Sequence, residues 1–212
     1  MYIKMNVNQI KVGHVVSFSD AVFAFSITIM ALSIQIPNFP SNIAESEFTK
    51  RLGEVVAPSI IHYIISFLVV GMYWIAYHRI FEHIRRANLT LVWLNLIYLL
   101  LISLVAYFTG LLSTYGTHRI VVISFASILT AAGFALSIIW WYATQNRRLV
   151  DNDIHPQLVR YFLVRGFASP VIFLASIGIA FIDVQLAAYF WIAIIPAYVI
   201  INKVHLSHIS KL

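Results

Sequence analysis

A single carboxylate, Asp20, lies within the first long apolar run of the chain, which extends from His14 to Pro37. A charged side chain inside a bilayer costs several kcal/mol unless it is paired or hydrated, so it marks a functional site by default. Such a carboxylate can bind a cation directly, or it can accept hydrogen bonds that hold neighbouring helices together. We expect the second role, because a buried carboxylate has to be paired or hydrogen-bonded.

Other combinations of reactive side chains do not have the spacing that enzymes or metal sites use. His78 and Glu82 are four residues apart, as two ligands on one helix face would be, but no third ligand follows at helical spacing and the chain has no cysteine. No Ser-His-Asp arrangement and no His-Glu-x-x-His motif is present. We therefore expect no catalytic residue, no bound metal and no cofactor.

The composition is that of a membrane protein. Hydrophobic residues make up 61% of the 212 residues and charged residues 10%, whereas charged residues make up about 25% of a soluble domain. The net charge of +6 would suit nucleic acid. The basic residues, however, occur in short clusters between apolar runs, which is the pattern of membrane topology. We expect a protein that lies in the lipid bilayer and binds no nucleic acid.

Six stretches are apolar over the length of about 20 residues that a membrane helix requires. The first is too long for the apolar region of a signal peptide, which is about 7–15 residues, so we expect it to remain as a helix. Pro58 falls in the first turn of the second helix, and Pro170 and Pro196 should kink the fifth and sixth. The polar connection 38–57 has room for a short amphipathic turn around 44–53. The sequence predicts one all-α integral membrane domain over 1–212, with helices at about 14–36, 58–80, 88–113, 119–144, 158–181 and 184–203.

The distribution of basic residues predicts the orientation of these helices. Of the 14 lysines and arginines, 11 fall on one side of the predicted bundle. Because basic loops stay in the cytoplasm, both chain termini are expected there. Glu45, Glu47, Glu54 and Asp183 fall on the opposite side, where they would gather cations weakly or act as ordinary solvated loop charges. The basic side holds Lys4, Lys11, Arg79, Arg85, Arg86, Arg147, Arg148, Arg160, Arg165, Lys203 and Lys211.

Segments along nearly the whole chain resemble the potassium channels related to the endolysosomal transmembrane protein 175. The most specific is Phe18-Ser19-Asp20, because it lies near the cytoplasmic end of the first of six helices. The sequence departs from the family at His14, where arginine is usual, and at Ala76-Tyr77, where an Asn-His pair is common. The other similar segments are Tyr73–Phe81 in the second helix, Trp93–Leu96 in the third and Arg165–Pro170 in the fifth.

The resemblance implies a pore lined by the first helix, with an apolar constriction instead of a filter of carbonyl groups. Helix geometry is consistent with it, because one stripe within about 60° contains Phe25, Ile29, Leu32 and Ile36 at about 100° per residue. Thr28 flanks this stripe, and Asp20 lies roughly 140° from Phe25. Without the resemblance, the same stripe would more simply be a face packed against another helix or lipid.

The polar residues near Asp20 are expected to form a structural network with it. Arg165 can either pair with Asp20 or extend to the membrane surface, and the sequence does not decide between these. We expect the network to include His14, Phe18, Ser19, Asp20, Trp74, His78 and Asn95.

The assembly follows from the resemblance as well. Only one Phe-Ser-Asp helix occurs in the chain, and animal relatives carry the six-helix unit twice and pair as dimers, so a homotetramer is implied. The expected protein is a potassium-preferring cation channel of a bacterial plasma membrane, with monovalent cations as permeant ions and proton permeation left open. A secondary transporter and an accessory membrane subunit are the alternatives.

Overall fold

The described part of the chain is helical almost throughout. The computed structural model describes residues 10–34, 38–40 and 42–209, with only the backbone at 33 and 204–209. Helices are favoured because a bilayer offers no water to backbone amides and carbonyls. Six helical stretches are long and apolar enough to span a membrane. The α-helices are α1 Val12–Met30, α2 Glu45–Phe81, α3 Leu89–Tyr115, α4 Arg119–Thr144, α5 Pro156–Ile179, α6 Val184–Phe190 and α7 Ile194–Ile209.

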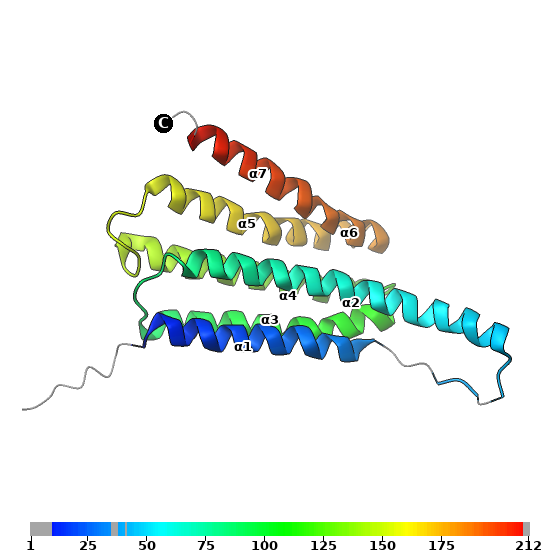
Figure 1. Ribbon diagram of the computed structural model, residues 1–212. Helices are drawn as coiled ribbons and strands as arrows, with labels where there is room; N and C mark the ends of the chain where they lie inside the picture. Colours follow the sequence, from blue (N-terminus) through cyan, green and yellow to red (C-terminus); the bar gives the residue numbers. More distant parts are fainter. Residues whose placement is uncertain (1–9, 35–37, 41, 210–212) are drawn as a thin grey trace, which may run out of the picture.

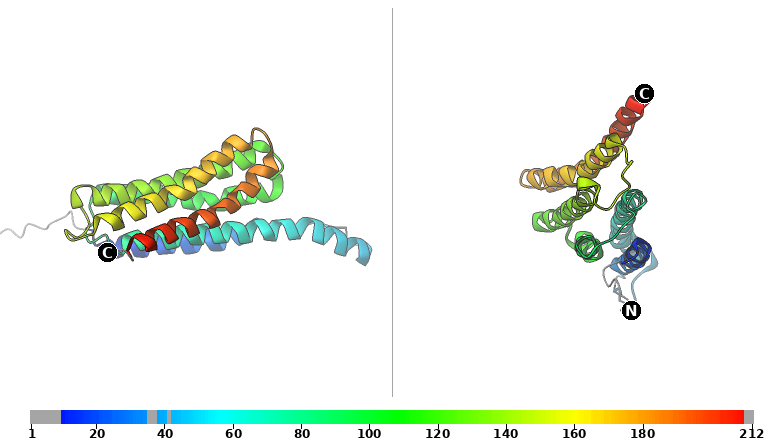
Figure 2. Two further views of the ribbon diagram at one scale, coloured as in Figure 1. Left: turned by 90° about the horizontal axis from the view of Figure 1, so that it is seen from above. Right: turned by 90° about the vertical axis from the view of Figure 1, so that its left-hand side faces the viewer.

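The helices form two layers (Figures 1 and 2). In one layer α3, α4 and α5 lie side by side, and in the other α1, α2 and α7 pack against them. At one end of the bundle α1, α3 and α5 begin and α2, α4 and α7 end. We call it the basic end, because its described residues include Lys11, Arg79, Arg85, Arg86, Arg147, Arg148, Arg160 and Lys203.

The second helix differs most from the sequence-based expectation. It begins at Glu45, so Pro58 lies inside it and most of the expected polar connection is helical. Seven of the thirteen helical residues before Pro58 are good helix formers, two acids stand in the first turn, and Arg51 forms an ion pair with Glu47 at 2.5 Å. These local terms offset the backbone hydrogen bond that proline removes. As a result α2 projects beyond the other helices at the end opposite the basic end (Figure 1).

The first and last helices differ less from the bounds that the sequence predicts. α1 stops at Met30 and a 3-10 turn follows over Ala31–Ser33; Ile36 lies outside the described residues. The expected sixth helix is split by a 3-10 turn over Trp191–Ala193. The split precedes Pro196 because a proline ring clashes with the carbonyl group four residues before it. By contrast, α4 has the bounds that the sequence indicates, and α3 and α5 differ from them by about two residues.

Two glycines let α4 and α5 approach closely. A Cβ atom at Gly133 would lie 2.8 Å from Cδ of Pro170, and one at Gly166 would lie 2.8 Å from Oγ of Ser137. Pro170 is therefore accommodated inside α5 by a site on α4 that has no side chain. α4 and α5 are therefore closely packed, and α2 and α7 pack against them.

Candidate functional site

The first helix has one buried face and one exposed face. Its outward side carries large apolar residues, with 54% of Phe18, 66% of Phe25 and 82% of Leu32 exposed. These three residues are seven positions apart, which keeps them on one side of a helix with 3.6 residues per turn. The buried side, which packs on α2 and α3, consists of Val15, Ser19, Phe23, Ser26 and Met30.

The residues expected to line a pore share the exposed side. Ile29 is 38% exposed, and Thr28 is also exposed. The hydroxyl group of Thr28 donates to the carbonyl oxygens of Ala24 and Phe25 at 3.0 Å. Because its hydrogen is directed to the backbone, the hydroxyl oxygen keeps a lone pair for an outside group. A row of large apolar side chains around one acceptor is suited to contact with another chain, lipid or a poorly hydrated ion.

Asp20 lies on the flank of α1 and binds two side chains of α2. Its Oδ1 atom accepts from Nε1 of Trp74 at 2.9 Å and lies 2.7 Å from Nε2 of His78. Trp74 and His78 are one helical turn apart, and their rings are in edge contact at 4.6 Å between centroids. The Asp20 side chain is still 42% exposed. The carboxylate therefore joins α1 to α2 at the edge of the bundle, not in its interior.

The buried centre of the motif is Ser19, which is 0% exposed. Its Oγ atom donates to the carbonyl oxygen of Val15 at 2.8 Å. The same atom accepts from the hydroxyl group of Tyr77 at 2.8 Å and from Nδ2 of Asn95 at 3.0 Å. One small hydroxyl group thus connects three helices, α1, α2 and α3.

Aromatic rings surround this buried junction. The ring of Tyr77 is parallel to that of Tyr98, with centroids 5.8 Å apart, and stacks on Phe81 at 4.1 Å. Phe23, one turn after Ser19, lies 5.9 Å from the Tyr77 ring. The rings exclude water from the junction, so an unpaired donor there would have no substitute partner.

The structure brings only some of the expected network residues together. Trp74 and His78 contact Asp20 as the sequence suggested, but Asn95 donates to Ser19 instead, and Tyr77 was not anticipated. His14 is exposed, as is Phe18. The sequence signal for Tyr77 was its position three residues after Trp74 and one residue before His78.

The structure also answers two further questions, the partner of Arg165 and a metal site at His78 and Glu82. Arg165 does not pair with Asp20, because its Nη1 atom donates to Tyr161 and Asn202. Within the described chain, no group of three His, Asp or Glu side chains could hold a metal ion. His78 and Glu82 therefore have no third ligand in that part of the protein, and His78 is engaged with Asp20.

The fold and this motif define a multi-pass helical membrane protein, and comparisons show which channels it is similar to. The profile of the family described as endosomal/lysosomal potassium channel TMEM175 matches residues 14–105, which include α1, α2 and most of α3. A potassium channel of Streptomyces collinus is 28% identical over 82% of this chain and 84% of its own. The rat endosomal/lysosomal proton channel TMEM175 is 25% identical over 92% of this chain but only 38% of its own.

The fold agrees with that comparison. The crystal structure of a lysosomal potassium-selective channel TMEM175 homolog from Chamaesiphon minutus superposes with a TM-score of 0.77 at 26% identity, over 90% of this chain and 98% of that one. The chain is thus similar to the TMEM175 family in sequence over residues 14–105 and in fold over most of its length. That family is described as one of potassium channels.

The Ser19 junction generates a prediction about stability. Ser19→Ala leaves the Tyr77 hydroxyl and the Asn95 amide without their acceptor, at a cost of about 1–3 kcal/mol for each buried group. We expect a lower thermal midpoint of the purified protein in detergent, with α1 loosened from α2 and α3. Ser127→Ala is the matched control, because Ser127 also donates to a carbonyl four residues earlier but is exposed. Equal midpoints for the two variants would show that the junction does not hold α1.

Proposed function

We propose that this protein is a potassium-preferring cation channel whose permeation path is lined by the exposed face of α1. The observation that carries the proposal is the row Phe18, Phe25 and Leu32, which is exposed although the opposite face of the same helix is fully packed. The names of the bacterial relatives support potassium as the permeant ion. Those of the animal relatives, which are called proton channels, leave proton permeation open.

Such a path requires several copies of the chain. One helix cannot enclose a pore, whereas copies around a closed rotation axis can. α1 lies at the edge of the bundle, so its outward face is accessible to neighbouring copies (Figure 2). The chain also aligns with 38% of the rat relative, as one repeated unit would. We therefore favour a homotetramer with four copies of α1 around a central axis.

The constriction would work through dehydration. Rings of Phe25 and Leu32 would be separated by about 10 Å along the axis, since a helix rises 1.5 Å per residue. Apolar rings gate by expelling water, and they offer no ligands to replace the hydration shell of an ion. Thr28 lies between these two rings in sequence, and its hydroxyl oxygen would supply the one polar ligand. Selectivity should therefore depend on Thr28 and stay modest.

The remaining parts of the proposal concern orientation and location. The basic end would face the cytoplasm, because basic loops are retained on that side. Both chain ends would then be cytoplasmic, and the extension of α2 with Glu45, Glu47 and Glu54 would lie outside. The matches to bacterial relatives over 82% and 84% of this chain favour a bacterial plasma membrane.

The first test is potassium flux through the purified protein in liposomes. We expect the wild-type protein to pass potassium, and Phe25→Ala to pass more because a smaller side chain widens the ring. Phe67→Ala is the control, since Phe67 is also exposed but lies on α2. No potassium flux in the wild type would refute the channel, and a Phe25→Ala flux equal to wild type at matched protein density would refute the gate at Phe25.

The second test concerns selectivity. Thr28→Ala removes the hydroxyl oxygen from the exposed face, and we expect a lower potassium-to-sodium permeability ratio with the pore still conducting. Thr28→Ser, which keeps the hydroxyl, should retain most of the wild-type ratio. Reversal potentials in asymmetric potassium and sodium solutions measure it. An unchanged ratio in Thr28→Ala would mean that Thr28 serves only its backbone hydrogen bonds.

The third test concerns the carboxylate. We propose that Asp20 positions α1 and does not contact ions, so Asp20→Leu, which removes the acceptor for Trp74 and His78, should lower oligomer stability before it changes selectivity. Asp20→Asn keeps an oxygen acceptor and should be milder. Oligomer size and thermal midpoint in detergent are compared with flux in liposomes. A stable Asp20→Leu oligomer with altered ion selectivity would place Asp20 in the permeation path.

A further inference from the structure

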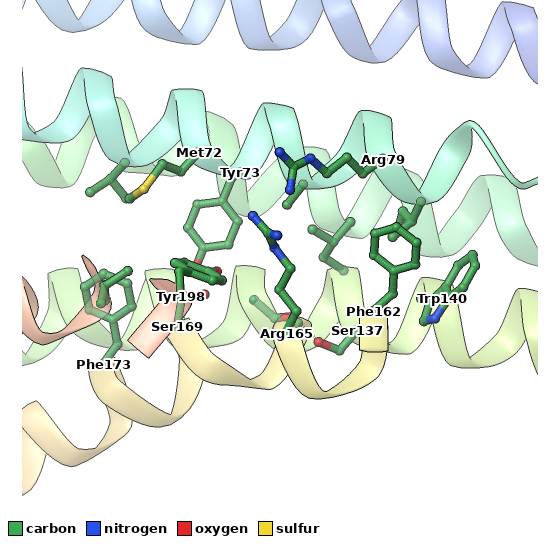
Figure 3. Close-up of a pocket in the computed structure, with 17 residues that line it drawn as sticks. Met72, Tyr73, Arg79, Ser137, Trp140, Phe162, Arg165, Ser169, Phe173 and Tyr198 are labelled. Carbon is green, nitrogen blue, oxygen red and sulfur yellow. Dashed lines mark hydrogen bonds between the residues drawn. The ribbon is translucent and has the colours of Figure 1, made fainter. Parts of the chain in front are cut away.

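A crevice on the side of the bundle away from α1 has no part in the proposed permeation path. It is a shallow opening with a cavity of about 40 Å³, between α2 and α7 with α4 and α5 as its floor. Its inner end is closed by Phe173 and Ile194, which are 1% and 3% exposed. Figure 3 shows Arg79 and Arg165 entering the crevice from α2 and from α5.

Arg165 is held in place by neutral groups only. Its Nη1 atom donates to the hydroxyl group of Tyr161 at 2.6 Å and to Oδ1 of Asn202 at 2.8 Å. The guanidinium carbon lies 5.1 Å from the centre of the Tyr198 ring. A guanidinium group has five N–H donors, and among the described residues those on Nη2 and Nε have no partner. The group is thus oriented but its charge is not neutralised.

Arg79 is less constrained. It lies near the end of α2, is exposed, and forms no hydrogen bond or ion pair with any residue that the structure describes. Its neighbour on the next turn, Glu82, is exposed as well and is not within ion-pair distance. Arg79 is therefore free to bind a ligand without breaking an existing contact.

The crevice contains two cationic groups and no acid. Its walls combine these two arginines with apolar and aromatic residues, together with a few hydroxyl groups. Two such cations attract an anion, and the attraction is stronger where nearby apolar groups lower the local polarity. Asp20 is already occupied by Trp74 and His78 on the far side of α2. The anion must therefore come from outside this part of the chain.

We propose that the crevice binds an anionic phospholipid, with the phosphate group between Arg79 and Arg165 and an acyl chain along the apolar outer wall, where 37% of Met72 is exposed. Guanidinium groups bind phosphate in a bidentate manner, which gives geometry as well as charge. The apolar walls of the crevice favour an amphiphile over a free anion. The surrounding basic end attracts anionic lipid, as basic segments at a membrane surface do.

Native mass spectrometry of the purified protein in neutral detergent tests this inference without any measurement of ion flux. Dioleoyl phosphatidylglycerol should bind more tightly than dioleoyl phosphatidylcholine, and Arg79→Gln should weaken phosphatidylglycerol binding about tenfold through the loss of a charge-assisted contact. Since Arg79 has no partner among the described residues, this variant should fold normally. Arg160→Gln is the matched control, because Arg160 is exposed on the same end of the protein but does not line the crevice.

Further binding measurements distinguish a lipid site from a site for any phosphate compound. Glycerol 1-phosphate, which has the phosphate without acyl chains, should bind much more weakly than the lipid. Equal binding of the two would replace the lipid site by a simple anion site and overturn the inference. Phosphatidylglycerol binding that is the same in wild type and Arg79→Gln would also overturn it. So would a changed oligomer size in Arg79→Gln, which would place Arg79 at a contact between copies.

Discussion

The position of α1 depends on one small hydroxyl group. Ser19 is completely buried and connects α1 to Tyr77 of α2 and Asn95 of α3. Alanine there would lack the acceptor, and a larger residue would displace the surrounding rings. Because the junction lies on one face of the helix, it also fixes which face is turned outward. The exposure of Phe25 and Leu32 is the geometric consequence of burying Ser19, Phe23 and Met30.

Contacts between loops close the basic end. N–H groups of Arg85 and Arg86 donate to the carbonyl oxygen of Leu149, and Nε of Arg85 donates to Asp151 at 2.8 Å. The hydrogen bond to Asp151 raises the pKa of Arg85. This pair is exposed, so its contribution to stability is small. Its effect is rather to keep the connection after α2 and the connection after α4 together, which fixes where α2 ends.

How far the sequence could predict the structure depends on which force dominates locally. α4 was predicted well because its long apolar run is bounded by polar residues at both ends. α2 was predicted with a late start because hydropathy does not detect a polar helix, and 45–57 is helical by propensity and charge placement. The two contacts of Asp20 followed from the family motif. The contact of Tyr77 with Ser19 did not, because Trp74, Tyr77 and His78 are close in sequence and only packing decides which of them turns inward.

Among the described residues, α2 is the helix shared by the motif and the crevice. It binds Asp20 through Trp74 and His78 on one side, and lines the crevice with Tyr73 and Arg79 on another. Tyr73 fixes it further, since its hydroxyl group donates to the carbonyl oxygen of Leu129 at 2.7 Å. α2 is thus held both to α1 and to α4. The crevice and the proposed permeation path are therefore joined through a single structural element.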